Sequence, residues 1–393
     1  MKRVALVVAV VLATHLTYEY SSNGDFYFPD SVTYLAPALN LLHGNGFTTD
    51  ENPETLRTPG YPLFLVPFLA VHAADWFIVF VQHLLVALLA AAIYLRTRNA
   101  VGPLVLAFDL ITIHFANKIL TETLSAVVLF AIFCVAARFS APDGGLKAAA
   151  TLGLLCGTLV LIRPVAIAYF CVVMLWLVYV RVRTRAVFAF AVAALVLPLG
   201  WAARNQIETG HFTVSPVGAV NLLMHHAAGA VAMEDGGDFD AAHEKRMAEL
   251  QKIVDARIKE GEEEDPDDVN SADVAPYYTA LARPIIVEHW RGTILVTLRG
   301  FFVNMFDTDW EALRIVTTVP GPIVRIAANI WTWMLWIATI AGLAMLWRRH
   351  RAQALLIAAT IVYFLFMAAG GEAEGRFRAP LIPLMAYAIA YAF

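Results

Sequence analysis

The stretch WFIVFVQHLLVALLAAAIYLRTR, residues 76–98, decides which class of protein this is. Its apolar run 76–95 contains no Asp, Glu, Lys or Arg, and two arginines follow it directly. A membrane-spanning helix needs about 20 consecutive, mainly apolar residues. Because the run is continuously apolar and does not alternate with polar residues, it predicts a transmembrane helix and excludes a strand of a closed barrel.

The composition of the whole chain agrees with an integral membrane protein. Of its 393 residues, 60% are hydrophobic and 15% are charged, whereas soluble domains carry about 25% charged and 45–50% apolar residues. The three cysteines lie inside apolar runs, so the sequence predicts no disulfide framework. It contains no nucleic-acid-binding motif, and no nucleic-acid partner is expected.

Similar apolar segments recur along the chain and predict an all-α bundle of about ten transmembrane helices. The first segment has a basic start, but no A-x-A-like cleavage site follows it, so it is interpreted as an uncleaved span and not as a signal peptide. The expected spans are residues 3–20, 76–95, 101–117, 119–138, 147–162, 164–181, 186–203, 324–347, 352–370 and 379–393.

Lysines and arginines in short loops indicate the orientation, because such loops are enriched in these residues on the cytoplasmic side. With the ten spans above, one set of twelve falls on a single side of the membrane. This distribution predicts a multi-pass protein of the cell (inner) membrane with both termini in the cytoplasm. The set is Lys2, Arg3, Arg96, Arg98, Arg138, Lys147, Arg181, Arg183, Arg185, Arg348, Arg349 and Arg351.

The remaining segments are expected on the opposite, non-cytoplasmic face. An N-terminal transmembrane bundle, residues 1–203, includes a first outer loop, 21–75, in which residues 60–72 predict a short interfacial helix. Residues 204–323 form a second, longer outer region, and residues 324–393 hold the C-terminal transmembrane helices.

Acidic residues are concentrated in that second outer region. Residues 204–291 hold 17 acidic and 8 basic side chains, a balance of −9, although the whole chain carries only −4. Residues 240–260 predict an amphipathic helix, and the stretch EGEEEDPDDVNSAD, residues 260–273, predicts a solvated loop.

Eight cations are left on or near the outer face, where the short-loop rule disfavours lysine and arginine. Each one alone is explained by snorkelling or by a local ion pair. As a group they favour an anionic ligand at the outer interface, and a lipid phosphate fits best because the planar guanidinium group suits phosphate. The eight are Arg57, Lys118, Arg163, Arg299, Arg314, Arg325, Arg376 and Arg378.

The loop EAEGRFRAPLIP, residues 372–383, is the densest group of outer-face charges. One interpretation is a charged turn that fixes the ends of two helices. The other is that Arg376 and Arg378, two residues apart in a non-helical turn, converge on one phosphate.

Two carboxylates stand at the edge of the membrane. Asp30 opens a short helix in FPDSVTYLAPALNLLHGNGF, residues 28–47, and aspartate is a preferred N-cap residue, so a cap and a chemical role are both open. Glu122 stands near the outer end of a span, where a carboxylate is costly and by default functional. A pair with Lys118 is the structural alternative for Glu122.

A series of short motifs resembles one family. After the acid at position 30 come LLHGNGF, RTPGYPLFL, ILTETL, RP, WAARN and finally RFRAPLIP, in this order. This series resembles the GT-C glycosyltransferases of family 39 type, which include protein O-mannosyltransferases and the aminoarabinose transferase that modifies lipid A. The chain departs from many relatives in having one acid, not two, at the first-loop position, and its outer region has no evident acceptor-binding module.

The resemblance implies a GT-C-like fold and a sugar donor carried on a polyprenyl phosphate. The implied enzyme is an inverting glycosyltransferase that moves a hexosyl or pentosyl group to a hydroxyl of a lipid, glycan or protein, on the non-cytoplasmic face. It also implies that Asp30 is the catalytic base and that Glu122 is the second catalytic carboxylate. It fixes no cofactor, and a divalent metal ion remains an open possibility.

The same resemblance and the outer-face charges suggest the residues that bind the substrates. The candidates for binding the donor phosphate are Arg57, Lys118, Arg163, Arg376 and Arg378. The candidates for binding the sugar or the acceptor are Tyr34, Tyr61 and Glu374.

The chemistry of the implied reaction agrees with these residues. A sugar phosphate already carries a good leaving group, so the acceptor hydroxyl needs a base and the departing phosphate needs cations. A lipid-linked sugar transporter or flippase remains an alternative, although no internal repeat supports it. A polymerase or ligase with a lipid-diphosphate donor is another.

Overall fold

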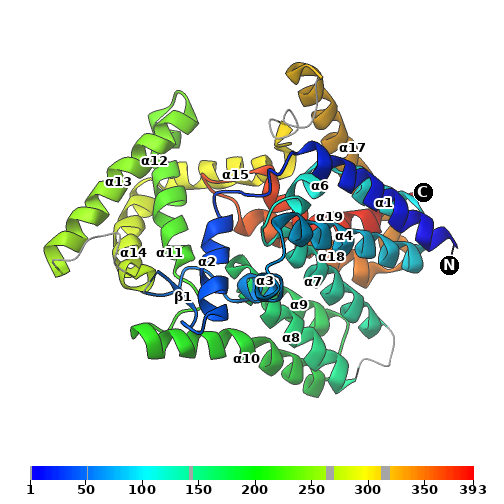
Figure 1. The fold of residues 1–393 in the computed structure, drawn as a ribbon, viewed down its shortest axis with the longest axis horizontal. Helices are drawn as coiled ribbons and strands as arrows, with labels where there is room; N and C mark the ends of the chain where they lie inside the picture. Colours follow the sequence, from blue (N-terminus) through cyan, green and yellow to red (C-terminus); the bar gives the residue numbers. More distant parts are fainter. Residues whose placement is uncertain (1, 51, 141–144, 263–269, 311–318) are drawn as a thin grey trace.

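The computed structural model describes residues 2–50, 52–140, 145–262, 270–310 and 319–393. These residues are mainly helical, and α1 (Lys2–Ser21) and α19 (Ile382–Ile389), near the two termini, lie on the same side of the view in Figure 1. The only strands among them, β1 (Thr48–Thr49) and β2 (Asn52–Pro53), form one short antiparallel ladder.

Within the described residues, five helices are long and apolar enough to cross a membrane. The chain is therefore a multi-pass membrane protein, as its composition predicts. The five are α1, α4 (Asp75–Thr97), α7 (Glu122–Ala136) with the 3-10 turn that extends it to Phe139, α10 (Thr184–Thr209) and α17 (Gly321–Arg349).

Other apolar segments form shorter helices, and one expected span is broken. Residues 101–117 form α5 (Val101–Phe108) and α6 (Leu110–Ala116) instead of one helix. The break lies at Asp109, whose backbone is extended and whose side chain accepts a hydrogen bond from the Thr112 amide, capping α6. The remaining short helices of the bundle are α8 (Leu146–Ile162), α9 (Tyr169–Tyr179), α18 (Arg351–Met367) and α19.

Small residues allow close packing between the helices of the bundle. A Cβ atom at Gly153 of α8 would lie 2.3 Å from the carbonyl oxygen of Phe190 in α10, so the two backbones meet there. Small residues serve the same purpose at helix contacts throughout membrane proteins. Because this packing fixes α8, it also fixes the position of Arg163, which follows the last residue of the helix, Ile162.

The segment between α1 and α4 holds two short helices, α2 (Ser31–Leu42) and α3 (Gly60–Ala70). The turn after α2 passes through Gly44 and Gly46 with φ of +82° and +79°, the left-handed conformation that glycine tolerates best. The short helix predicted for residues 60–72 is thus confirmed as α3. Both helices bury aromatic side chains against α4 and α6.

The region between α10 and α17 is also helical where it is described. Its helices α11 to α14 gather at one side of the bundle in Figure 1, and the predicted amphipathic helix is α13. Most of the acidic loop and Arg314 lie outside the described residues. The elements are α11 (Val217–Asn221), the π-helix η3 (Leu222–Ala227), α12 (Ala228–Asp235), α13 (Phe239–Glu262), α14 (Ser271–Glu288) and α15 (Trp290–Phe306).

Candidate active site

Arg376 joins the two carboxylates that the sequence analysis selects. Its Nη2 donates to Asp30 Oδ2 at 2.7 Å, and its Nε donates to Glu122 Oε1 at 2.6 Å. The guanidinium carbon lies 4.8 Å from the centre of the Phe28 ring, and the side chain is 8% exposed. Residues from the beginning, the middle and the end of the chain therefore meet at one guanidinium group.

Two further arginines complete this group. Arg57 Nη2 donates to Asp30 Oδ1 at 2.9 Å, and Arg163 Nη1 donates to Glu122 Oε1 at 3.3 Å. We call Asp30, Glu122, Arg57, Arg163 and Arg376 the arginine–carboxylate cluster. Three guanidinium groups face two carboxylates, so the cluster carries one positive charge in excess.

The local backbone explains the position of each carboxylate. Asp30 stands at the N-cap position of α2, but its side chain makes no capping hydrogen bond. Both of its oxygens go to arginines instead, so the interpretation as a plain cap is wrong. Glu122 begins α7, where the positive end of the helix dipole favours a carboxylate.

The positions of the arginines follow from breaks in helices. Arg163 has an extended backbone because it precedes Pro164, and this ends α8 at the cluster. Arg376 belongs to the 3-10 turn η5 (Gly375–Leu381), which precedes α19.

Arg378 anchors this turn and does not reach the cluster. Its side chain is fully buried, and it donates to the carbonyl oxygens of Asn304 at 2.9 Å and Asp307 at 3.0 Å. The prediction that Arg376 and Arg378 converge is therefore wrong. In a 3-10 turn, with three residues per turn, side chains two positions apart point in different directions.

Lys118 also lies outside the cluster. Its Nζ is 2.7 Å from Asp25 Oδ2 and donates to the Asp25 carbonyl oxygen at 3.0 Å. The expected pair between Lys118 and Glu122 is wrong, because Arg376 and Arg163 bind Glu122 instead.

The two tyrosines predicted as ligand-binding residues, Tyr34 and Tyr61, pack against each other near Arg57. Tyr34 and Tyr61 are buried and meet edge to face, with ring centres 5.3 Å apart. Arg57 lies over the Tyr34 ring at 4.9 Å, and the Tyr61 hydroxyl donates to Gln82 at 2.9 Å. In this structure Tyr34 positions Arg57, Tyr61 packs behind Tyr34, and both buried side chains leave little surface for a ligand.

Glu374 stands at the edge of the cluster. Its Oε1 lies 3.6 Å from Arg376 Nη1, and its side chain is 37% exposed. Burial raises the pKa of Glu374 to about 7, since Arg376 lowers it less than burial and the neighbouring carboxylates raise it. Burial also acts to raise the pKa of Asp30, but Arg376 and Arg57 outweigh it and hold that pKa below its ordinary value.

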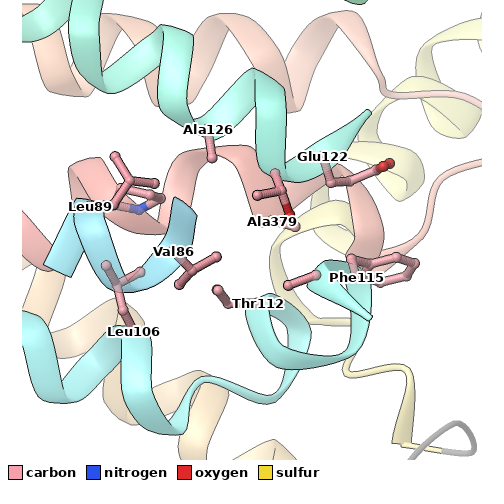
Figure 2. A pocket seen from close by; sticks show the side chains of 11 residues that line it. Val86, Leu89, Leu106, Thr112, Phe115, Glu122, Ala126 and Ala379 are labelled. Carbon is pink, nitrogen blue, oxygen red and sulfur yellow. The ribbon is translucent and has the colours of Figure 1, made fainter. Parts of the chain in front are cut away.

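Two small cavities adjoin the cluster. One is lined by Glu122 and by apolar side chains that include Val86, Leu89 and Leu106. Figure 2 shows the Glu122 carboxylate pointing away from these three. The other lies beside Arg163, with Phe377 and Leu159 in its mainly apolar lining.

Some cluster neighbours were not selected from the sequence. Phe28 stacks on Arg376, and Thr33 Oγ1 accepts a hydrogen bond from Arg57 Nε at 2.8 Å. Thr33 lies three residues after Asp30, on the same face of α2, so helical spacing was an available signal for it.

In the described part of the chain, no group of three His, Cys, Asp or Glu side chains could hold a metal ion. The two carboxylates selected from the sequence, Asp30 and Glu122, are bound by arginines.

Comparison with known proteins finds similar solved structures but no matching family model or curated protein. No family model matches the chain. No curated protein matches it either. Two similar solved structures are those of ArnT from Cupriavidus metallidurans, one bound to undecaprenyl phosphate and one in the apo state.

The first ArnT structure has a TM-score of 0.41 and 13% identity, over 99% of this chain and 78% of that chain. The apo structure has a TM-score of 0.40 and 14% identity, over 100% and 78%. Since both TM-scores are below 0.5, the function proposed below rests on the residues of this chain.

Proposed function

We propose that this chain is a membrane glycosyltransferase that moves a sugar from a polyprenyl-phosphate donor to a hydroxyl group of an acceptor. The observation that carries this proposal is the arginine–carboxylate cluster. It combines three guanidinium groups, which suit a phosphate, with Asp30, which suits a general base. All of them stand at the ends or breaks of apolar helices, where a lipid phosphate lies while its tail stays in the bilayer.

The proposed orientation follows the charges in the short loops. Both termini are cytoplasmic, and the cluster faces the non-cytoplasmic side. Residues 1–203 and 324–393 form the membrane part in this account, and residues 204–323 form the outer region.

The donor phosphate and the carboxylates compete for the same N–H groups. Arg57 and Arg376 each bind Asp30 in the structure, and a phosphate at this place accepts hydrogen bonds from both. Asp30 then loses cationic partners, so its pKa rises towards the ordinary value and it becomes a better base. The base is thus freed only when a donor is bound.

Asp30 then takes the proton of the acceptor hydroxyl while the hydroxyl oxygen attacks the anomeric carbon. The bond from this carbon to the phosphate oxygen breaks, and the configuration at the carbon inverts. The lipid phosphate leaves with the bonding electron pair, and the arginines stabilise its charge.

Incubation of the purified protein with labelled polyprenyl-phosphate hexoses and pentoses tests this function. We expect release of polyprenyl phosphate together with a glycosylated acceptor, and loss of release in Arg376→Ala. Arg325→Ala is the matched control, because Arg325 is an outer-face cation that lies over the Trp310 ring at 5.8 Å. Movement of the intact donor across vesicles without release would instead indicate a flippase.

A further inference from the structure

Besides Glu122, the guanidinium group of Arg376 contacts Asp30 and Glu374, and it holds these two carboxylates in different ways. Arg376 Nη2 donates to Asp30 at 2.7 Å, and Asp30 is bound by Arg57 as well. Arg376 Nη1 lies 3.6 Å from Glu374, too far for a good hydrogen bond. Both oxygens of Asp30 therefore accept hydrogen bonds from arginines, whereas Glu374 makes only a longer contact with another nitrogen of Arg376.

The backbone holds Glu374 at this place. Its amide donates to Asn304 Oδ1 at 3.1 Å, and the next amide, of Gly375, donates to Asp307 Oδ2 at 2.7 Å. A Cβ atom at Gly375 would lie 2.5 Å from the Asp307 carbonyl oxygen, so only glycine fits there. These contacts fix the backbone at Glu374, and this places its carboxyl group beside the cluster.

The charges around Glu374 give its carboxyl group a higher pKa than that of Asp30. Arg376 attracts its ionised form, whereas burial and the carboxylates of Glu372, Asp309 and Glu122 disfavour that form. The resulting pKa is about 7, so near neutral pH much of Glu374 is protonated. Asp30, with its lowered pKa, is ionised there. Two carboxyl groups whose environments push their pKa values apart suit the roles of acid and base.

We propose that Glu374 is the general acid of the reaction, which protonates the departing phosphate oxygen while Asp30 deprotonates the acceptor. This inference rests on the proposed function. The acceptor oxygen bonds to the anomeric carbon, and the bond from that carbon to the phosphate oxygen breaks. One proton passes from the acceptor to Asp30, and another passes from Glu374 to the leaving phosphate. Solvent returns the Asp30 proton to Glu374 after the products leave.

The charge balance of the cluster explains the need for an acid. A polyprenyl-phosphate sugar is a phosphodiester with one negative charge, which matches the single positive excess of the cluster when Glu374 and Glu372, whose pKa values burial raises, are protonated. Transfer of the sugar leaves a phosphate monoester with a second negative charge, next to the Glu122 carboxylate. Its second pKa is about 6, close to that of Glu374, so proton transfer between the two groups costs little.

The pH dependence of turnover tests this role in the variant Glu374→Gln, which keeps the shape and the hydrogen-bonding groups. In the wild type, turnover of a polyprenyl-phosphate sugar falls about tenfold for each pH unit above about 7. We expect Glu374→Gln to be slower by about a hundredfold or more near neutral pH and to lose this fall.

Glu372→Gln is the matched control. Glu372 lies two residues earlier in the same loop, and its Oε2 is 3.1 Å from His225 Nε2. We expect this variant to keep a fall at high pH, with a somewhat lower midpoint, because the Glu372 carboxylate no longer raises the pKa of Glu374. A Glu374→Gln enzyme that keeps both the wild-type rate and the wild-type fall would overturn the assignment.

Infrared spectroscopy separates this inference from the proposed function. We expect a protonated-carboxyl band near neutral pH that Glu374→Gln removes and that added undecaprenyl phosphate strengthens. If no labelled donor releases polyprenyl phosphate, the proposed function fails. If the band is absent in the wild type, or is unchanged in Glu374→Gln, the inference about Glu374 fails whatever the turnover.

Discussion

At the scale of single residues, the two arginines of the RFR motif have different roles. Arg376 binds two carboxylates and is 8% exposed. Arg378 is fully buried and binds backbone carbonyl oxygens at the C-terminal end of α15 and directly after it. The sequence RFR indicates two equivalent cations, and only the 3-10 turn separates them. Sequence reasoning therefore predicts that this loop is important but not which arginine reaches the site.

Substitution of each arginine by alanine should separate the two roles. We expect Arg376→Ala to weaken polyprenyl-phosphate binding by roughly 1.5–3 kcal/mol, the range for hydrogen bonds to charged groups. It should also lower the thermal midpoint, because the buried Glu122 keeps only Arg163 as a partner. Arg378→Ala should lower the thermal midpoint without weakening binding by the folded protein, because each carbonyl left without a partner costs about 1–3 kcal/mol. Lipid-phosphate binding and thermal unfolding, measured on both variants, check this. Equal loss of binding in two equally stable variants would contradict the separation.

At the scale of the secondary-structure elements, α1 is held to the bundle by polar contacts. Most of its surface is not buried in the protein, and its buried residues are Val11 and His15. His15 Nδ1 lies 2.9 Å from His83 Nδ1, and its Nε2 lies 3.0 Å from the Leu106 carbonyl oxygen. Together with the Tyr18 hydroxyl, 2.7 Å from His114 Nδ1, these contacts hold α1, which leads to Phe28 and Asp30.

Replacement of His15 by leucine keeps α1 apolar but removes both contacts. We expect a lower thermal midpoint, equivalent to about 1–3 kcal/mol, since His83 and the Leu106 carbonyl oxygen lose a partner in an apolar setting. Thr17→Val is the control, because the Thr17 hydroxyl bonds to Ala13 of its own helix. A His15→Leu protein as stable as the control would show that the two contacts of His15 do not hold α1.

Element positions are predictable from the sequence where apolar runs are long, and less so where polar residues interrupt them. The runs that became α4 and α10 are easily recognised. Asp109 breaks the expected span 101–117, because its side chain caps a new helix in the interior. Asp30 shows the opposite case, since a preferred capping residue at a helix start does not cap. The Asp109 cap is local, to Thr112 three residues later, whereas the role of Asp30 depends on a partner distant in sequence, Arg376, which local patterns do not show.

At the scale of the whole molecule, the account depends on which side of the membrane carries the cluster. We expect a cysteine at Lys252 in α13 to react with an impermeant thiol reagent added outside intact cells. A cysteine at Arg183, in the short turn before α10, should react only after permeabilisation. Both positions are exposed, and the three native cysteines are replaced first. The opposite labelling pattern would place the cluster on the cytoplasmic side.

The central claim is that Asp30 accepts the proton of the acceptor, and turnover of Asp30→Asn beside its thermal stability tests it most directly. Asparagine keeps the shape of the side chain and caps a helix about as well as aspartate, but it does not accept the proton. The account predicts a folded protein, with only a modest change in thermal midpoint, that releases polyprenyl phosphate at least about a hundredfold more slowly. Near-wild-type release by a folded Asp30→Asn protein would contradict the account and leave Glu122 as the next carboxylate to test.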